Sequence, residues 1–129
     1  DAFIIAADTL TQNPNTGQVF RKPNNLEEQK VQALKTAGQP VRIISGVSIF
    51  HKGKEIEAAI SESVVTYQDF NEQTLERLME NDNPTIRSSI LGMFFDAAGF
   101  TLVEKVEGSY TGAFGLPMEI VYPHLRDVN

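Results

Sequence analysis

The chain has 129 residues, and its 41% hydrophobic and 22% charged residues are ordinary values for one globular domain. Seventeen acidic against eleven basic residues give a net charge of −6, which excludes a broad nucleic-acid surface because duplex binding needs many lysine and arginine contacts to phosphate. The chain has no cysteine, which excludes disulfides and thiolate chemistry and is compatible with an expected cytoplasmic location, and no apolar run reaches the roughly 20 residues of a membrane-spanning helix.

The chain opens with an apolar stretch, residues 2–7, which predicts a strand buried on both faces. Asp8 follows it and is therefore expected at the carboxyl end of a core strand. In open α/β sheets ligands bind at this edge, where a carboxylate can hold a divalent metal or activate a water. The next loop is expected to fold back and bring Lys22 toward Asp8. On the residues alone, a turn or cap role for Asp8 and a solvated role for Lys22 remain open.

The middle of the chain alternates between helix and strand signals. A helix is predicted after Asn25, which can cap it, and a central strand over residues 42–50. A glycine-containing link over residues 51–54 predicts a hairpin. The strand after it alternates, which places Ile56 and Ile60 on its apolar face.

The remaining elements are a second helix, a strand and a last short helix, expected after Asn71, over residues 101–106 and over residues 118–122. This order predicts one α/β domain spanning residues 1–129. Its architecture is expected to be a mixed twisted sheet with helices packed on its faces.

Five short motifs follow one another along the chain: Asp1–Thr9, Arg21–Pro23, Ile44–Val47, Val106–Tyr110 and Gly115–Pro117. In this order and spacing they resemble the Maf (septum-formation-inhibitor-like) family of nucleoside triphosphate pyrophosphatases. The resemblance implies a Maf/ITPase-like fold. It also implies an N-terminally incomplete chain, the C-terminal two-thirds of the family fold, because the family's opening Ser-Pro-Arg-Arg motif has no counterpart here.

The resemblance implies a metal-assisted attack of water on the α-phosphate, which releases a nucleoside monophosphate and pyrophosphate. On this basis Asp8 is the expected catalytic carboxylate and the ligand of Mg²⁺ or Mn²⁺. Lys22 is the expected cation on the phosphate oxygens, and Arg21 adds a second cation where the family has glycine. Thr9 lies at a position that the family uses to select the base, with a hydroxyl bonded to local backbone as the open alternative.

Asp96 lies where relatives that cleave dTTP or UTP carry Gln and where those acting on 7-methyl-GTP carry Glu. A carboxylate accepts from the N–H edge of a guanine but cannot donate as an amide does, so Asp96 favours a purine-type or modified-guanine substrate. A role for Asp96 as a turn or cap residue is the alternative.

Several positions depart from the family pattern, among them residues 88–92 and Gly112, which stands where Asn is common. Such departures are typical of a divergent or inactive relative. The alternative function is therefore a catalytically inactive nucleotide-binding or regulatory module, and a structural or interaction domain is the third. The implied partner is a nucleoside triphosphate, with no nucleic acid polymer and no membrane, and the resemblance also allows a homodimer.

Overall fold

The computed structural model describes residues 2–80 and 101–126. A five-stranded sheet in the order β2-β1-β3-β4-β5 forms the centre of the fold. The strands are β1 (Phe3–Gln12), β2 (Val19–Phe20), β3 (Pro40–His51), β4 (Lys54–Tyr67) and β5 (Val103–Gly108). Each of the four neighbouring pairs is antiparallel.

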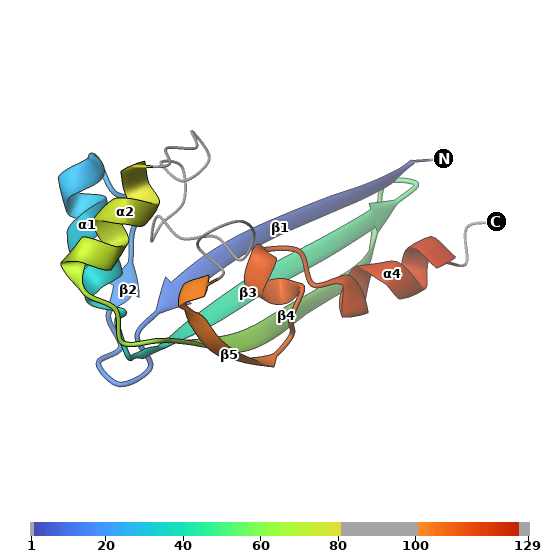
Figure 1. Ribbon diagram of the computed structural model, residues 1–129. Helices are drawn as coiled ribbons and strands as arrows, with labels where there is room; N and C mark the ends of the chain where they lie inside the picture. The colour runs from blue at the N-terminus through green and yellow to red at the C-terminus, as the bar shows by residue number, and fades with distance from the viewer. Residues whose placement is uncertain (1, 81–100, 127–129) are drawn as a thin grey trace.

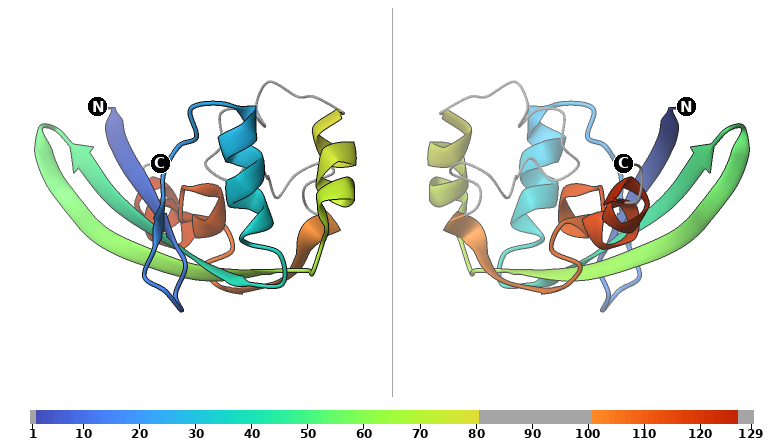
Figure 2. Two further views of the ribbon diagram at one scale, coloured as in Figure 1. Left: turned by 90° about the vertical axis from the view of Figure 1, so that its left-hand side faces the viewer. Right: turned by 90° about the vertical axis from the view of Figure 1, so that its right-hand side faces the viewer.

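The helices lie inside the curve of this sheet (Figure 1, Figure 2). They are α1 (Leu26–Leu34), α2 (Glu72–Glu80), the short 3-10 helix η2 (Gly112–Phe114) and α4 (Met118–Arg126). α1 and α2 lie side by side over one end of the sheet, and η2 and α4 cover its middle and other end. The predicted α/β class is confirmed. The sheet was expected to be mixed with helices on its faces, and in the described residues its strands are all antiparallel and its helices lie on one face (Figure 2). None of the helices described is long and apolar enough to cross a membrane.

Local signals place the start of α1 and the central hairpin. The Asn25 side chain accepts a hydrogen bond from the Glu28 N–H at 2.9 Å, and the Glu28 carboxylate accepts from the Asn24 N–H at 2.8 Å. This reciprocal pair satisfies N–H groups that the first helical turn leaves free. Lys52 and Gly53 both have positive φ, as a two-residue hairpin turn requires. Both predicted features are confirmed.

Two clusters of buried side chains form the core. The larger one packs beneath α1 and α2 and consists of Phe20, Ala33, Val41, Ile43, Val65, Tyr67, Phe70, Leu75, Leu102 and Ala113. The smaller one fixes α4 to the sheet and consists of Val47, Ile49 and Val121. Both lie on the concave side, so the described part of the chain buries one face of its sheet.

The first strand differs from its prediction. β1 continues four residues past Asp8, and it is not buried on both faces: Ile4 is 64% exposed and Ala6 is also exposed. The reason is that the described helices cover the concave face alone, so side chains of the other parity face outward. Asp8 therefore lies within an antiparallel strand, not at the carboxyl end of a core strand.

In β4, the second strand of the hairpin, the buried face is the opposite of the one predicted. Ile56 and Ile60, predicted on a buried face, are exposed, with Ile60 at 72%. Ser61 and Ser63 are buried instead. The segment that leads into η2 and α4 packs on the serine side, so position in the fold overrides the hydrophobic preference of the alternation.

Candidate functional site

Asp8 occupies an open position on the sheet. It pairs with Gly46 of β3, and no atom lies within 4 Å of the point where a Cβ of Gly46 would stand. One carboxylate oxygen of Asp8 accepts a hydrogen bond from the Thr9 N–H at 3.0 Å. Among the described strands, β2 alone borders β1 on its outer side, and it pairs only with Thr11 and Gln12. Within the described residues, no strand therefore pairs with the outer edge of β1 beside Asp8.

The loop after β1 folds back as predicted. β2 runs antiparallel to β1, with Phe20 opposite Thr11 and Val19 opposite Gln12. Arg21 and Lys22 come directly after this pairing and lead into α1. The loop thus reverses the chain beside the outer edge of β1, while the expected approach of Lys22 to Asp8 stays a prediction.

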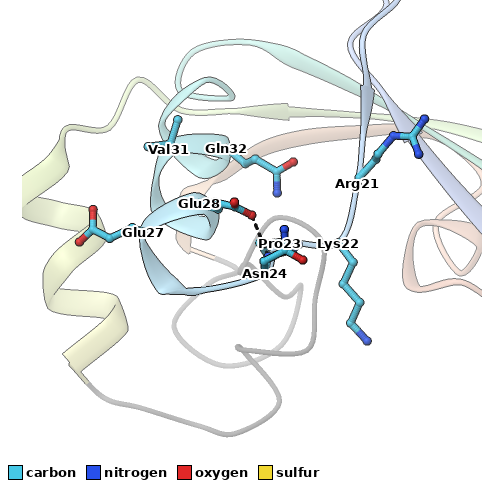
Figure 3. Close-up of a pocket in the computed structure, with 8 residues that line it drawn as sticks. All are labelled: Arg21, Lys22, Pro23, Asn24, Glu27, Glu28, Val31 and Gln32. Atoms are coloured by element: carbon cyan, nitrogen blue, oxygen red, sulfur yellow. Dashed lines mark hydrogen bonds between the residues drawn. The ribbon is translucent and has the colours of Figure 1, made fainter.

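Lys22 and Arg21 line a hollow of about 590 Å³ at the start of α1 (Figure 3). Their side chains extend in different directions, and Glu27 and Glu28 supply opposite charge on the same hollow. Asp8 does not line it, and no ion pair joins Asp8 to Lys22 within the residues described. The pairing of these two side chains around one ligand stays a prediction.

Thr9 points to the other face of β1 and takes part in a contact that the sequence did not predict. Its hydroxyl lies 3.1 Å from the hydroxyl of Ser45, and Ser45 donates to the Gly112 carbonyl at 3.1 Å. The Thr9 hydroxyl thus contacts a side chain, whereas the expected alternative was a hydrogen bond to local backbone. Thr9 instead belongs to a connection between β1, β3 and η2.

A second connection fixes the start of α4 on β4. Ser61 donates to one carboxylate oxygen of Glu119 at 3.0 Å, and Thr111 donates to the other at 3.2 Å. The Thr111 hydroxyl also accepts from the Met118 N–H at 2.8 Å. These residues line a shallow hollow of about 630 Å³. Their spacing carries no metal or catalytic motif, so the resemblance over residues 106–117 was the signal that pointed to this segment.

The family comparison bears on this arrangement. The sequence profile of the Maf-like protein family matches residues 1–128, almost the whole chain. The chain belongs to the Maf-like family. The predicted resemblance is thereby confirmed.

The Maf-like chain is similar to several proteins named dTTP/UTP pyrophosphatase. The relative in Porphyromonas gingivalis is 27% identical over 125 residues, which cover 97% of this chain and 61% of the relative. The relatives in Dictyoglomus thermophilum and Pyrococcus abyssi are each 29% identical, over 119 and 118 residues, which cover 92% of this chain and 60% of each relative. The chain thus spans about three-fifths of the length of these relatives.

The residues present fit a divalent metal in a limited way. In the described residues no three His, Cys, Asp or Glu side chains gather into a metal site. Mg²⁺, however, keeps several waters and is usually held by one or two carboxylates together with substrate phosphates. Asp8 is exposed, and its Thr9 N–H contact leaves acceptor positions free. Asp8 is therefore a carboxylate that a divalent metal could use if other groups supplied the remaining ligands. Asp96, the other predicted substrate residue, lies outside the described residues.

The hydrogen bonds around Glu119 make it a pH-sensitive contact. Partial desolvation is the largest influence on this carboxyl group and raises its pKa. Hydrogen bonds outweigh it, and they come from Ser109, from the N–H of Glu119 itself, and then from Ser61 and Thr111. The pKa of Glu119 is therefore lower than the usual value for a glutamate. Ionised Glu119 thus stabilises the folded chain above the unfolded pKa, and this contribution disappears as the pH falls through the folded pKa.

Glu119→Gln is expected to lower the free energy of unfolding at pH 7 and to lose this effect as the pH falls below about 4. The side chain is exposed, so the difference will be small. Urea unfolding at several pH values between 7 and 3 measures it. Glu55→Gln, the same substitution at an exposed position on the same sheet, is the control for the loss of a carboxylate as such. A Glu119→Gln difference that stays constant with pH would contradict the assignment.

Proposed function

We propose that this Maf-like chain is a nucleoside triphosphate pyrophosphatase whose substrate lies along the edge of β1 beside Asp8. Two findings support this: the match to the family over residues 1–128 and the names of the similar proteins. The observation that carries the proposal is structural. An exposed carboxylate, Asp8, lies beside a part of the β1 edge with which no described strand pairs, and Arg21 and Lys22 follow β2, which borders the same edge farther along.

In this proposal each residue has a separate task. A bound Mg²⁺ or Mn²⁺ would offset charge on the phosphates when the nucleotide is present. Asp8 would hold the metal and would accept the proton of the attacking water, whose oxygen would bond to the α-phosphorus as the bond to the bridging oxygen breaks and pyrophosphate leaves. Lys22 and Arg21 neutralise phosphate oxygens, with the guanidinium of Arg21 able to make a two-pronged contact. Thr9, at the same edge but on the other face, contributes to base selection.

Two observations point to different bases. The similar proteins are named dTTP/UTP pyrophosphatases, which makes dTTP and UTP the first substrates to test. Asp96 in place of an amide favours a purine-type base such as guanine or 7-methylguanine. A homodimer, as the resemblance allows, stays a prediction.

A nucleotide panel tests the reaction. With Mg²⁺ or Mn²⁺, the chain is expected to convert at least one of dTTP, UTP, GTP and 7-methyl-GTP into one monophosphate and one pyrophosphate per turnover. Chelation of the metal should stop it. Ion-exchange analysis of the products distinguishes this cleavage from loss of the γ-phosphate, which would yield a diphosphate and orthophosphate. Diphosphate products, or no hydrolysis by the chain, would contradict the proposal.

The second candidate is a nucleotide-binding or regulatory module without turnover, which the departures from the family pattern at residues 88–92 favour. A ligand that binds only the folded state raises the melting temperature as its concentration rises. The same four nucleotides in a thermal-shift assay therefore separate the two candidates. Stabilisation without hydrolysis favours the module, and the absence of both favours a structural or interaction domain.

A further inference from the structure

Three hydroxyl side chains form a row across the concave face of the sheet. Thr9 pairs with Ser45, and Ser45 pairs with Ser61, so the three lie at one level on β1, β3 and β4. Ser45 is in the centre and is 1% exposed. A hydroxyl group has one proton to donate, and that of Ser45 goes to the Gly112 carbonyl, so Thr9 is the donor in the Thr9 to Ser45 contact.

The segment Gly112–Gly115 lies directly on this row. A Cβ on Gly112 would stand 2.8 Å from the Ser61 hydroxyl oxygen, and a Cβ on Gly115 would stand 3.5 Å from that of Thr9. Gly115 also has φ +104°, a conformation that side chains rarely adopt. The turn therefore packs closely on this row, and Ser45 is the residue that bonds both to Thr9 and to the turn.

We propose that Ser45 is a positioning residue for the nucleotide site. It holds Thr9, the neighbour of Asp8, and the Gly112–Gly115 turn in a fixed relation, and so sets how tightly the base is bound. Ser45 does not touch the substrate, because its hydroxyl is buried and both of its bonds are to the protein. The functional part of this inference rests on the proposed pyrophosphatase activity; the positioning of the turn does not.

Kinetics of Ser45→Ala test the functional part. Loss of a neutral hydrogen bond that orders a binding element is expected to raise KM by about five- to tenfold, with kcat changed less than about twofold. Simple destabilisation acts differently, because a smaller folded fraction lowers the apparent kcat and leaves KM unchanged. The matched control is Ser48→Ala, the same change on β3 but on the opposite face, where the described residues offer the side chain no hydrogen bond. It should leave both constants unchanged.

Hydrogen exchange tests the positioning without any nucleotide. The Ala113 amide donates to the Ser109 and Tyr110 carbonyls at 3.2 Å, and the Gly115 amide donates to the Gly112 carbonyl at 2.9 Å. Ser45→Ala should speed their exchange at least about tenfold, and Ser48→Ala should not. Unchanged exchange would overturn the positioning role, and faster exchange with an unchanged KM would confine Ser45 to a structural task and overturn the functional part. A wild-type chain without turnover would count against the proposed function, while the exchange result would still decide the role of Ser45.

Discussion

Asp8→Asn is expected to lower kcat for pyrophosphate release by about 10²- to 10⁴-fold, the range of a lost general base. Asparagine has nearly the same shape, but it can neither accept the proton of the attacking water nor bring a negative charge to the metal. The fold should tolerate the change, because Asp8 is exposed and, among the residues described, its side chain hydrogen-bonds only to the neighbouring Thr9 N–H. Steady-state measurement of pyrophosphate release gives kcat, and the melting temperature checks the fold.

Two comparisons make the Asp8 result specific. Asp69→Asn is the same chemical change at an exposed position on the link into α2, and it should leave kcat unchanged. Lys22→Gln should instead raise KM more than it lowers kcat, because Lys22 is expected to hold the phosphates in both the bound and the transition state. An Asp8→Asn protein that keeps the wild-type rate would remove Asp8 from the mechanism.

Gly108→Ala is expected to lower the free energy of unfolding by about 2 to 4 kcal/mol, from backbone strain and overpacking together. Gly108 has φ +85°, where an L side chain is strained, and it pairs with Ser63 at the end of β5. A Cβ there would stand 2.6 Å from the Glu62 carbonyl oxygen and 3.2 Å from the Ser63 Cα. Because both neighbours are backbone atoms, β5 would have to shift away from β4.

Gly53→Ala separates the clash from the strain. Gly53 has φ +75°, but nothing lies within 4 Å of its added Cβ, so this variant should lose only about 1 to 2 kcal/mol. Urea unfolding of both variants gives the difference. Equal losses would show that β4 and β5 are not packed as closely at Gly108 as the structure has them.

Features encoded by near neighbours in the sequence were the ones that sequence reasoning predicted well. Asn25 precedes an acidic helical turn, and its side chain needs only the Glu28 N–H to cap α1. Gly53 lies between two strand-forming stretches, so the hairpin follows from the turn geometry alone. These structures form from contacts within a few residues, and composition and spacing are enough to indicate them.

Features that depend on distant packing were predicted less well. Alternation along β4 shows that Ile60 and Ser61 face opposite ways, but not which face the rest of the chain covers. That is decided by Glu119, 58 residues after Ser61, whose carboxylate accepts from the serine and makes its burial favourable. The position of Asp8 was predicted wrongly for a similar reason. A run of apolar residues occurs both in a central strand and in a strand with one exposed face, so the run alone does not tell them apart.

The same limit applies to the candidate site. The family motifs indicated Asp8, Thr9 and Lys22 together, and the returning loop was foreseen from its turn-forming composition. The contact from Thr9 through Ser45 to Gly112 was not foreseen. Thr9 and Ser45 are 36 positions apart in the sequence, and Ser45 and Gly112 are 67 positions apart. No local pattern marks such a contact.

The central claim is that a metal-bound nucleotide lies at the open edge of β1, between Asp8 and Lys22. Paramagnetic Mn²⁺ tests it most directly, because the ion broadens the NMR signals of nearby amides. With a non-hydrolysable triphosphate present, substoichiometric Mn²⁺ should broaden the amides of Asp8, Thr9 and Lys22 first, and Asp8→Asn should abolish the effect. Broadening centred on the acidic helix Glu72–Glu80, or unaffected by Asp8→Asn, would contradict the account.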